Sequence, residues 1–195
     1  MFDLPVQDAR ARLGEVLARL HRDERIELVD GQVVTQTAPL SQHGAAQAGL
    51  MAALGPFRPR EPGARGPGGW WLMTEVEVLY AKSDEVFRHD ALGYRRALHP
   101  ERPEGFPLEA RPDWVCEVLS AKTARNDLVK KQRTLHAQEV PHYWVLDPEH
   151  ETLTVLRWAE PAYLRVLDAG LGDLARAEPF ESLEISIAEI FGRDD

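Results

Sequence analysis

The chain has 195 residues and a formal net charge of −9, and its 44% hydrophobic and 28% charged residues are typical of an ordinary soluble protein. This length predicts one domain, residues 1–195, with a buried core. The single cysteine, Cys116, excludes a disulfide framework and favours the cytoplasm, and the absence of an uninterrupted apolar run near the amino terminus argues against a signal peptide or membrane span.

The first third of the chain predicts two helices and a hairpin. Residues 7–21 form an amphipathic helix, and residues 25–36 form two short strands around an Asp-Gly turn. Ser41 is placed to cap a second helix that ends near Leu54. Residues 55–69 contain nine glycines or prolines, which predicts a surface loop rather than a domain boundary.

The remainder predicts a central sheet with one long helix. The expected strands cover residues 70–79, 85–94, 114–119 and 143–146, a strand pair covers 152–158 and 163–167, and helices cover 123–138 and a short segment capped by Ser186. This order predicts a single mixed α/β domain.

Two charged residues interrupt apolar patterns in adjacent elements. Glu117 lies inside an apolar strand, where a charge is costly unless it is paired or bound to a cation. In the next helix, at about 100° per residue, Ala124, Leu128 and Leu135 define an apolar face with Lys131 near its centre. A buried acid and a buried ammonium that face one interface indicate a site.

The preceding strand supplies a second acid, Asp90. Two carboxylates on neighbouring strands can hold a hard divalent cation such as Mg²⁺, or Mn²⁺ in its place. The metal activates water and neutralises charge on a phosphodiester, and a lysine such as Lys131 can orient that water. The alternative is a structural ion pair between Glu117 and Lys131, with Asp90 serving only as a turn residue.

The chain resembles the PD-(D/E)XK nuclease superfamily, and specifically its Uma-type branch of restriction-endonuclease-like proteins. The stretches that carry the resemblance are 26–31, His43, 69–71, Asp90, 112–120, Thr123, Asp127, Lys131 and 140–148. The resemblance covers about residues 25–190. It implies a core of helix, three strands, helix and strand, to which the N-terminal strands and a C-terminal strand pair are added.

The resemblance also implies that Asp90 and Glu117 are the metal ligands. One departure concerns the lysine, which in the superfamily stands two residues after the acid on the same strand. Leu119 occupies that place here, and in this branch the lysine has moved to the next helix, as Lys131.

Further residues are candidates for the site, each with a plainer alternative. Glu77 can approach the metal or lie on an exposed strand face, and His43 can reach the site or be an inert, partly buried histidine. Asp113 can bind metal or simply begin its strand after Pro112. Four basic residues flank the proposed site and form either a phosphate-binding ridge or a solvated helix face: Lys122, Arg125, Lys130 and Arg133.

The charge distribution weakens the argument that the net charge makes against a nucleic-acid partner. The net charge argues against nucleic acid, but residues 88–133 carry ten basic and seven acidic residues, whereas residues 168–195 carry two basic and eight acidic ones. From the candidate site and the resemblance together, we predict a metal-dependent endonuclease that hydrolyses DNA, with a homodimer as a further expectation. The alternative is a catalytically silent nucleic-acid-binding or interaction protein that retains the fold.

Overall fold

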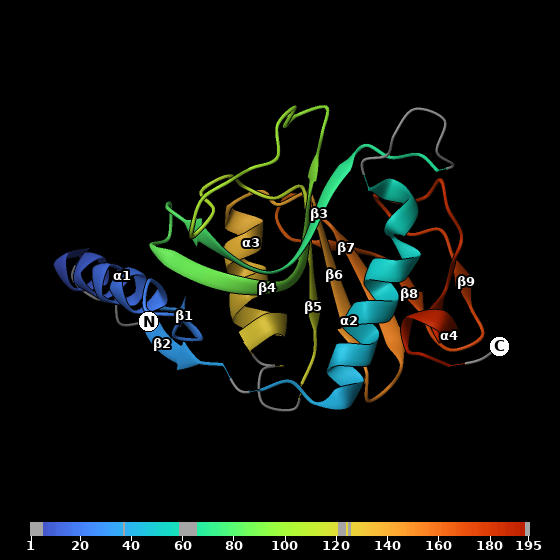
Figure 1. The fold of residues 1–195 in the computed structure, drawn as a ribbon, viewed down its shortest axis with the longest axis horizontal. Helices are drawn as coiled ribbons and strands as arrows, with labels where there is room; N and C mark the ends of the chain where they lie inside the picture. Colours follow the sequence, from blue (N-terminus) through green and yellow to red (C-terminus); the bar gives the residue numbers. More distant parts are fainter. Residues whose placement is uncertain (1–5, 37, 59–65, 121–123, 125, 194–195) are drawn as a thin grey trace.

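The computed structural model describes residues 6–36, 38–58, 66–120, 124 and 126–193 (Figure 1). Their centre is a mixed sheet of eight strands in the order β2-β1-β4-β5-β6-β7-β8, with β3 paired to β4. The strands are β1 (Ile26–Val29), β2 (Gln32–Thr35), β3 (Trp70–Tyr80), β4 (Glu85–Arg95), β5 (Trp114–Val118), β6 (His142–Asp147), β7 (Thr152–Arg157) and β8 (Leu164–Ala169).

Helices cover both faces of this sheet. On one face, α2 packs beside α4, and on the other face of β5 lies α3 (Figure 1). A small second sheet of β9 and β10 adjoins α4 in the chain. The remaining elements are α1 (Val6–Leu20), α2 (Ser41–Ala53), η1 (Gly55–Phe57), η2 (Asn126–Lys131), α3 (Gln132–Ala137), β9 (Leu174–Ala175), β10 (Ile185–Ser186) and α4 (Ile187–Ile190).

The predicted mixed α/β class is confirmed, and most predicted elements lie within a few residues of their expected bounds. The β1–β2 hairpin turns at Asp30 and Gly31, both with positive φ (53° and 68°), as a two-residue turn requires. The Ser186 hydroxyl caps α4 by accepting from the N–H of Glu189 at 3.2 Å. The capping prediction for α2 was wrong, because Leu40 is the cap residue, without a side-chain cap, and Ser41 begins the helix.

Strand β5 separates the two faces of the core. Cys116 and Val118 belong to the cluster that includes the α2 residue Leu50, whereas Val115 packs in the cluster that includes Leu135 of α3. Because side chains alternate along a strand, Glu117 shares the α3 side with Val115. The fold thus turns Glu117 toward the helix that follows it.

The edge of β4 that faces β5 contains a gap. Strand β3 pairs with β4 along its length except at Glu75 and Asp90, while the opposite edge is shared: β1 meets it at Val86 and β5 meets it only at residues 91–93. Between these two partners, this edge of β4 has no neighbouring strand around Arg88 among the described residues. The candidate site is built at this gap.

Candidate functional site

A cavity of about 520 Å³ lies at the gap, next to the carboxyl ends of β5 and β6. Its walls come from elements far apart in sequence, including β1, the start of α2, β3, β4, β5 and η2. The charged and ionisable residues that line it are Arg25, Glu27, His43, Glu75, Arg88, Asp90, Glu117, Asp127, Lys131, Asp147 and Glu149. Asp90, Glu117 and Lys131, the three residues expected at the centre of the site, therefore share one cavity.

Side chains take the place of a neighbouring strand at the gap. The N–H of Arg88 donates to Glu27 Oε1 at 2.8 Å, and the carbonyl of Arg88 lies 3.5 Å from Lys131 Nζ. The carbonyl of Asp90 accepts from Gln47 Nε2 at 2.7 Å. These contacts satisfy backbone groups that would otherwise be buried without partners, so the site residues also hold β4 in place.

Lys131 is the positive centre of the site. Its Nζ lies 2.8 Å from Glu27 Oε1, 3.3 Å from Glu117 Oε1 and 3.3 Å from Asp127 Oδ1, and only 3% of the residue is exposed. Burial alone would lower the pKa of Lys131, but the three carboxylates outweigh it and hold the pKa well above its ordinary value. Lys131 is therefore a permanent ammonium at neutral pH.

The turn that carries Lys131 differs from the expected α-helix. Residues 126–131 form a π-helical turn, in which the wider i→i+5 spacing buries Asp127 and Lys131 together. Leu128, which was predicted to lie on the apolar face, is instead 43% exposed, whereas Leu135 is fully buried. The prediction for Leu128 was wrong because it assumed 100° per residue throughout the helix.

Glu117 is held by a buried chain of hydrogen bonds that runs through His89 of β4 to Tyr80 of β3. Its Oε1 lies 2.5 Å from Nδ1 of His89, and Nε2 of the same ring lies 2.7 Å from the hydroxyl of Tyr80. Burial lowers the pKa of His89 well below its ordinary value and raises the pKa of Tyr80, so the ring is neutral and the phenol keeps its proton. The tautomer that satisfies both contacts has Tyr80 donating to Nε2 and Nδ1–H donating to Glu117.

Burial also raises the pKa of the Glu117 carboxyl well above its ordinary value. The charge of Lys131 opposes this rise, while the charge of Asp90 adds to it. The contact between His89 and Glu117 was not predicted, because it depends on how β4 and β5 pair. A histidine directly before Asp90 was the available signal.

Asp90 points toward the other side of the cavity, where it meets His43. His43 Nε2 lies 3.1 Å from Asp90 Oδ1, and Asp90 Oδ2 accepts the backbone N–H of Val118 at 2.7 Å. The hydrogen bond to Asp90 is the main cause that raises the pKa of His43. The candidate His43 therefore reaches the site from the first turn of α2.

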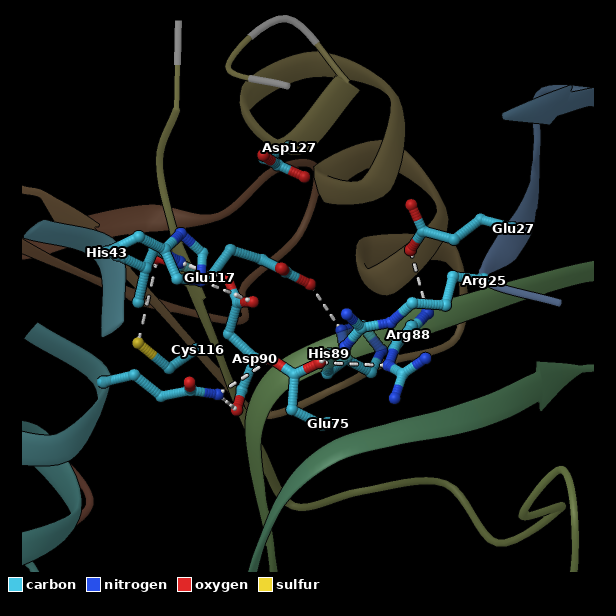
Figure 2. A network of polar contacts seen from close by, with 12 residues as sticks. Arg25, Glu27, His43, Glu75, Arg88, His89, Asp90, Cys116, Glu117 and Asp127 are labelled. Carbon is cyan, nitrogen blue, oxygen red and sulfur yellow. Dashed lines mark hydrogen bonds and ion pairs between the residues drawn. The ribbon is translucent and has the colours of Figure 1, made fainter. Parts of the chain in front are cut away.

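A third residue, Glu75, joins this pair. One ligand atom from each of His43, Glu75 and Asp90 lies within 4.8 Å of the other two, close enough to hold one metal ion. Figure 2 shows Asp90 and Glu75 between His43 on one side and Arg25 and Arg88 on the other. Glu117 is not a member of this group of three, although it lines the same cavity.

Glu75 was not among the expected site residues, whereas its neighbour Glu77 was. Glu75 has a left-handed backbone (φ 56°) opposite Asp90 and is left out of the β3–β4 ladder. Glu77 instead pairs with Arg88 Nη1 at 3.2 Å and does not line the cavity. A positive φ at a glutamate in mid-strand cannot be recognised from the pattern of residues, because glutamate rarely adopts it.

The other candidates lie outside the cavity or outside the described residues. Asp113 accepts the N–H of Arg95 at 2.7 Å and does not line the cavity, so it belongs to the start of β5. Lys130 is half-buried beside Lys131 and also does not line the cavity. Lys122 and Arg125 fall on residues outside the described part of the chain.

Comparisons with known proteins agree with the fold and the expected family. The Uma2 model, described as "putative restriction endonuclease", matches residues 13–188, and the chain belongs to this family. The crystal structure of a "putative nuclease belonging to DUF820" from Anabaena variabilis has the same fold. It is 18% identical with a TM-score of 0.63, over 90% of this chain and 96% of that one. No curated protein matches the sequence. Among the described residues, no helix is long and apolar enough to cross a membrane.

Proposed function

We propose that the protein is a metal-dependent endonuclease that hydrolyses DNA phosphodiester bonds in the cavity at the β4 gap. The observation that carries the proposal is an imbalance of buried charge. Three carboxylates, those of Glu27, Glu117 and Asp127, surround the single ammonium of Lys131, and Asp90 lines the same cavity. Buried carboxylates need a positive partner, and a divalent cation among them would supply it.

The donor set fits a divalent metal. Asp90 and Glu117, which line the same cavity, would supply the carboxylate oxygens that Mg²⁺ prefers. His43 and Glu75 would add an imidazole and a third carboxylate near Asp90, which suits Mn²⁺ as well. When bound, the metal would activate water and neutralise charge on the phosphodiester. Burial raises the pKa of Glu117, and the nearby charge of Asp90 adds to the rise; a divalent cation beside this carboxyl would oppose both effects.

Lys131 would assist the attacking water by donating hydrogen bonds. Because its pKa is raised, it carries a positive charge throughout the physiological range and does not act as a proton acceptor. Its contacts with Glu27 and Glu117 fix the ammonium at one wall of the cavity. In that place it would orient the water and stabilise negative charge that develops on the phosphate.

The test is a plasmid-nicking assay with purified protein. We expect nicking with Mg²⁺ or Mn²⁺, its loss on addition of chelator, and a fall of at least about 100-fold in the Glu117→Gln variant, since a metal-ligating and charge-stabilising group is removed. Glu181→Gln, which changes an exposed carboxylate outside the cavity, serves as the matched control and should nick like the wild type. Equal nicking by wild type and Glu117→Gln would contradict the proposal.

One observation favours the alternative of a catalytically silent DNA-binding protein. Glu117 Oε1 already has two internal partners, Lys131 and His89, so this carboxylate is satisfied without a metal. A silent binder would retain DNA with a steep salt dependence in the presence of chelator and would not nick the plasmid with any divalent metal. The same nicking assay therefore separates the two functions.

A further inference from the structure

Two arginines and one glutamate form a distinct cluster in the cavity wall. Glu75 Oε2 lies 3.2 Å from Arg25 Nη2 and 3.1 Å from Arg88 Nε, and Glu75 Oε1 accepts from Gln47 Nε2 at 3.1 Å. Arg25, Arg88 and Glu75 all line the cavity. Glu75 therefore stands between two guanidinium groups on one side and the pair of His43 and Asp90 on the other (Figure 2).

Arg88 is incompletely satisfied in this arrangement. Its Nε is buried, and the 3.1 Å approach to Glu75 lacks the geometry of a hydrogen bond, so this N–H has no hydrogen-bond acceptor among the described residues. Buried polar groups without partners are rare, and in a cavity wall they point to a ligand that supplies the acceptor. Guanidinium groups bind phosphate oxygens through two parallel N–H donors, so a phosphodiester is the ligand that matches this chemistry.

The charges support an exchange between phosphate and carboxylate. Arg25 and Arg88 are balanced by Glu75 and by Glu77, which pairs with Arg88 Nη1 at 3.2 Å. A phosphodiester carries one negative charge, as Glu75 does, so it can replace Glu75 beside the arginines without changing the net charge. The displaced carboxylate stays close to His43 and Asp90, so a cation bound beside these two residues would give it a positive partner.

We propose that Arg25 and Arg88 form the phosphate-binding wall of the cavity, and that a DNA backbone phosphate displaces Glu75 from them and releases it to become a metal ligand beside His43 and Asp90. Substrate binding and metal binding are thereby coupled through one side chain. The phosphate site stands on the geometry of the arginines alone, and the release of Glu75 to a metal rests on the proposed function.

The first experiment measures DNA affinity without metal. A fluorescein-labelled DNA duplex of mixed sequence is titrated in chelator, and its anisotropy is followed at several salt concentrations. Arg25→Gln and Arg88→Gln should each weaken binding about tenfold and reduce the salt slope by about one. Glu75→Gln should strengthen binding about tenfold, because the internal competitor for the arginines loses its charge. Arg165→Gln, an exposed arginine on β8 outside the cavity, should bind like the wild type.

The second experiment measures Mn²⁺-dependent cleavage by the same proteins. Glu75→Gln should cleave at least about tenfold more slowly than the wild type while it binds DNA more tightly, a pairing that a purely structural role for Glu75 would not produce. Thermal unfolding of each variant confirms folding. Arg25 has a side chain that is 49% exposed, so Arg25→Gln tests the wall even if Arg88→Gln fails to fold.

The outcomes separate this proposal from the proposed function. Wild-type affinity in Arg25→Gln, or weaker binding in Glu75→Gln, would overturn the phosphate exchange even if the protein cleaves DNA. Conversely, one outcome is that the wild type cleaves no DNA while the variants follow the expected order of DNA affinity. That result would support the phosphate-binding wall and contradict the proposed nuclease function. Tighter binding by Glu75→Gln together with wild-type cleavage would overturn the release of Glu75 to a metal.

Discussion

A single buried ammonium holds three acidic side chains together at the centre of this protein. Lys131 contacts Glu27, Glu117 and Asp127, and each of the four residues is at most 4% exposed. Removing one partner of a buried charge network leaves the others uncompensated, which costs more than any surface pair contributes. The site is therefore also a determinant of stability.

The stability role predicts a contrast between neighbouring lysines. Lys131→Ala should lower the free energy of unfolding by about 3–5 kcal/mol, because three buried carboxylates lose their positive partner. Lys130→Ala, which changes a half-buried lysine outside the cavity, should change it by about 0.5 kcal/mol or less. Urea unfolding at pH 7 in chelator measures both, and similar losses in the two variants would show that the network does not stabilise the fold.

At the residue scale, the sequence identified two central site residues, Glu117 and Lys131, but not all of the side chains that contact the site. The acid within an apolar strand and the lysine at the centre of an apolar helix face were both unusual, and the structure brings Glu117 and Lys131 to 3.3 Å. His89 and Glu75 were missed for different reasons. The first depends on strand register, and the second depends on a left-handed backbone at φ 56° that no local pattern indicates.

At the scale of elements, the π-helical turn η2 decides which side chains enter the site. It buries Asp127 and Lys131 four residues apart and turns Leu128 outward, where regular α-helical spacing would have buried Leu128. The prediction of a helix over this segment was correct in position, but its spacing could not be read from the sequence, because wider turns have no distinct residue pattern. The apolar side chain of Leu128 was misleading for this reason.

The turn predicts unequal effects for two leucines that regular spacing would treat alike. Leu135→Ala should destabilise the protein by about 2–5 kcal/mol, because Leu135 is fully buried, whereas Leu128→Ala should cost less than about 1 kcal/mol. Thermal or urea unfolding of the two variants provides the comparison. Equal losses would indicate that Leu128 is buried in solution and that the turn is an ordinary α-helix.

For the molecule as a whole, the class and order of elements followed from periodicity and turn residues, and the sheet topology did not. The hairpin at Asp30-Gly31 is a local feature that local sequence determines. The sharing of one β4 edge by β1 and β5 is a contact between distant segments, so no window of sequence contains it. The cavity exists because of that shared edge, which explains why candidate residues could be named but their arrangement could not.

The raised pKa of Glu117 predicts how pH and metal act on global stability. Because burial raises this pKa in the folded state above its ordinary value of 4.5, the stability that Glu117 contributes is full below pH 4.5 and is lost as pH rises through the folded-state pKa. Over that interval, in chelator, the free energy of unfolding of Glu117→Gln should rise relative to that of the wild type by about 1.4 kcal/mol per pH unit. The comparison uses the variant because His89, whose pKa is lowered by burial, acts in the opposite sense below pH 6.5.

A bound metal should reverse this loss. Metal binding requires an ionised Glu117 and a neutral His43. The pKa of each group is raised, that of Glu117 by burial and that of His43 by its hydrogen bond to Asp90, so protons compete with the metal at both residues. The rise in unfolding temperature produced by Mn²⁺ should therefore be larger at pH 8 than at pH 6, and much smaller in Glu117→Gln. Calorimetry at the two pH values measures this, and an equal rise at both would contradict metal binding through these groups.

The gap in the sheet beside Arg88 affects which site residues would persist in a relative that had lost catalytic activity. Glu27, Lys131 and Gln47 stand in for an absent strand by bonding the β4 main chain, so folding alone would keep them in a descendant that no longer cuts anything. The polar contacts of the His43 and Glu75 side chains among the described residues are with other side chains and not with the main chain, so the fold depends on these two residues less. In a set of relatives, the survival of that second pair would distinguish working enzymes from inherited scaffolds.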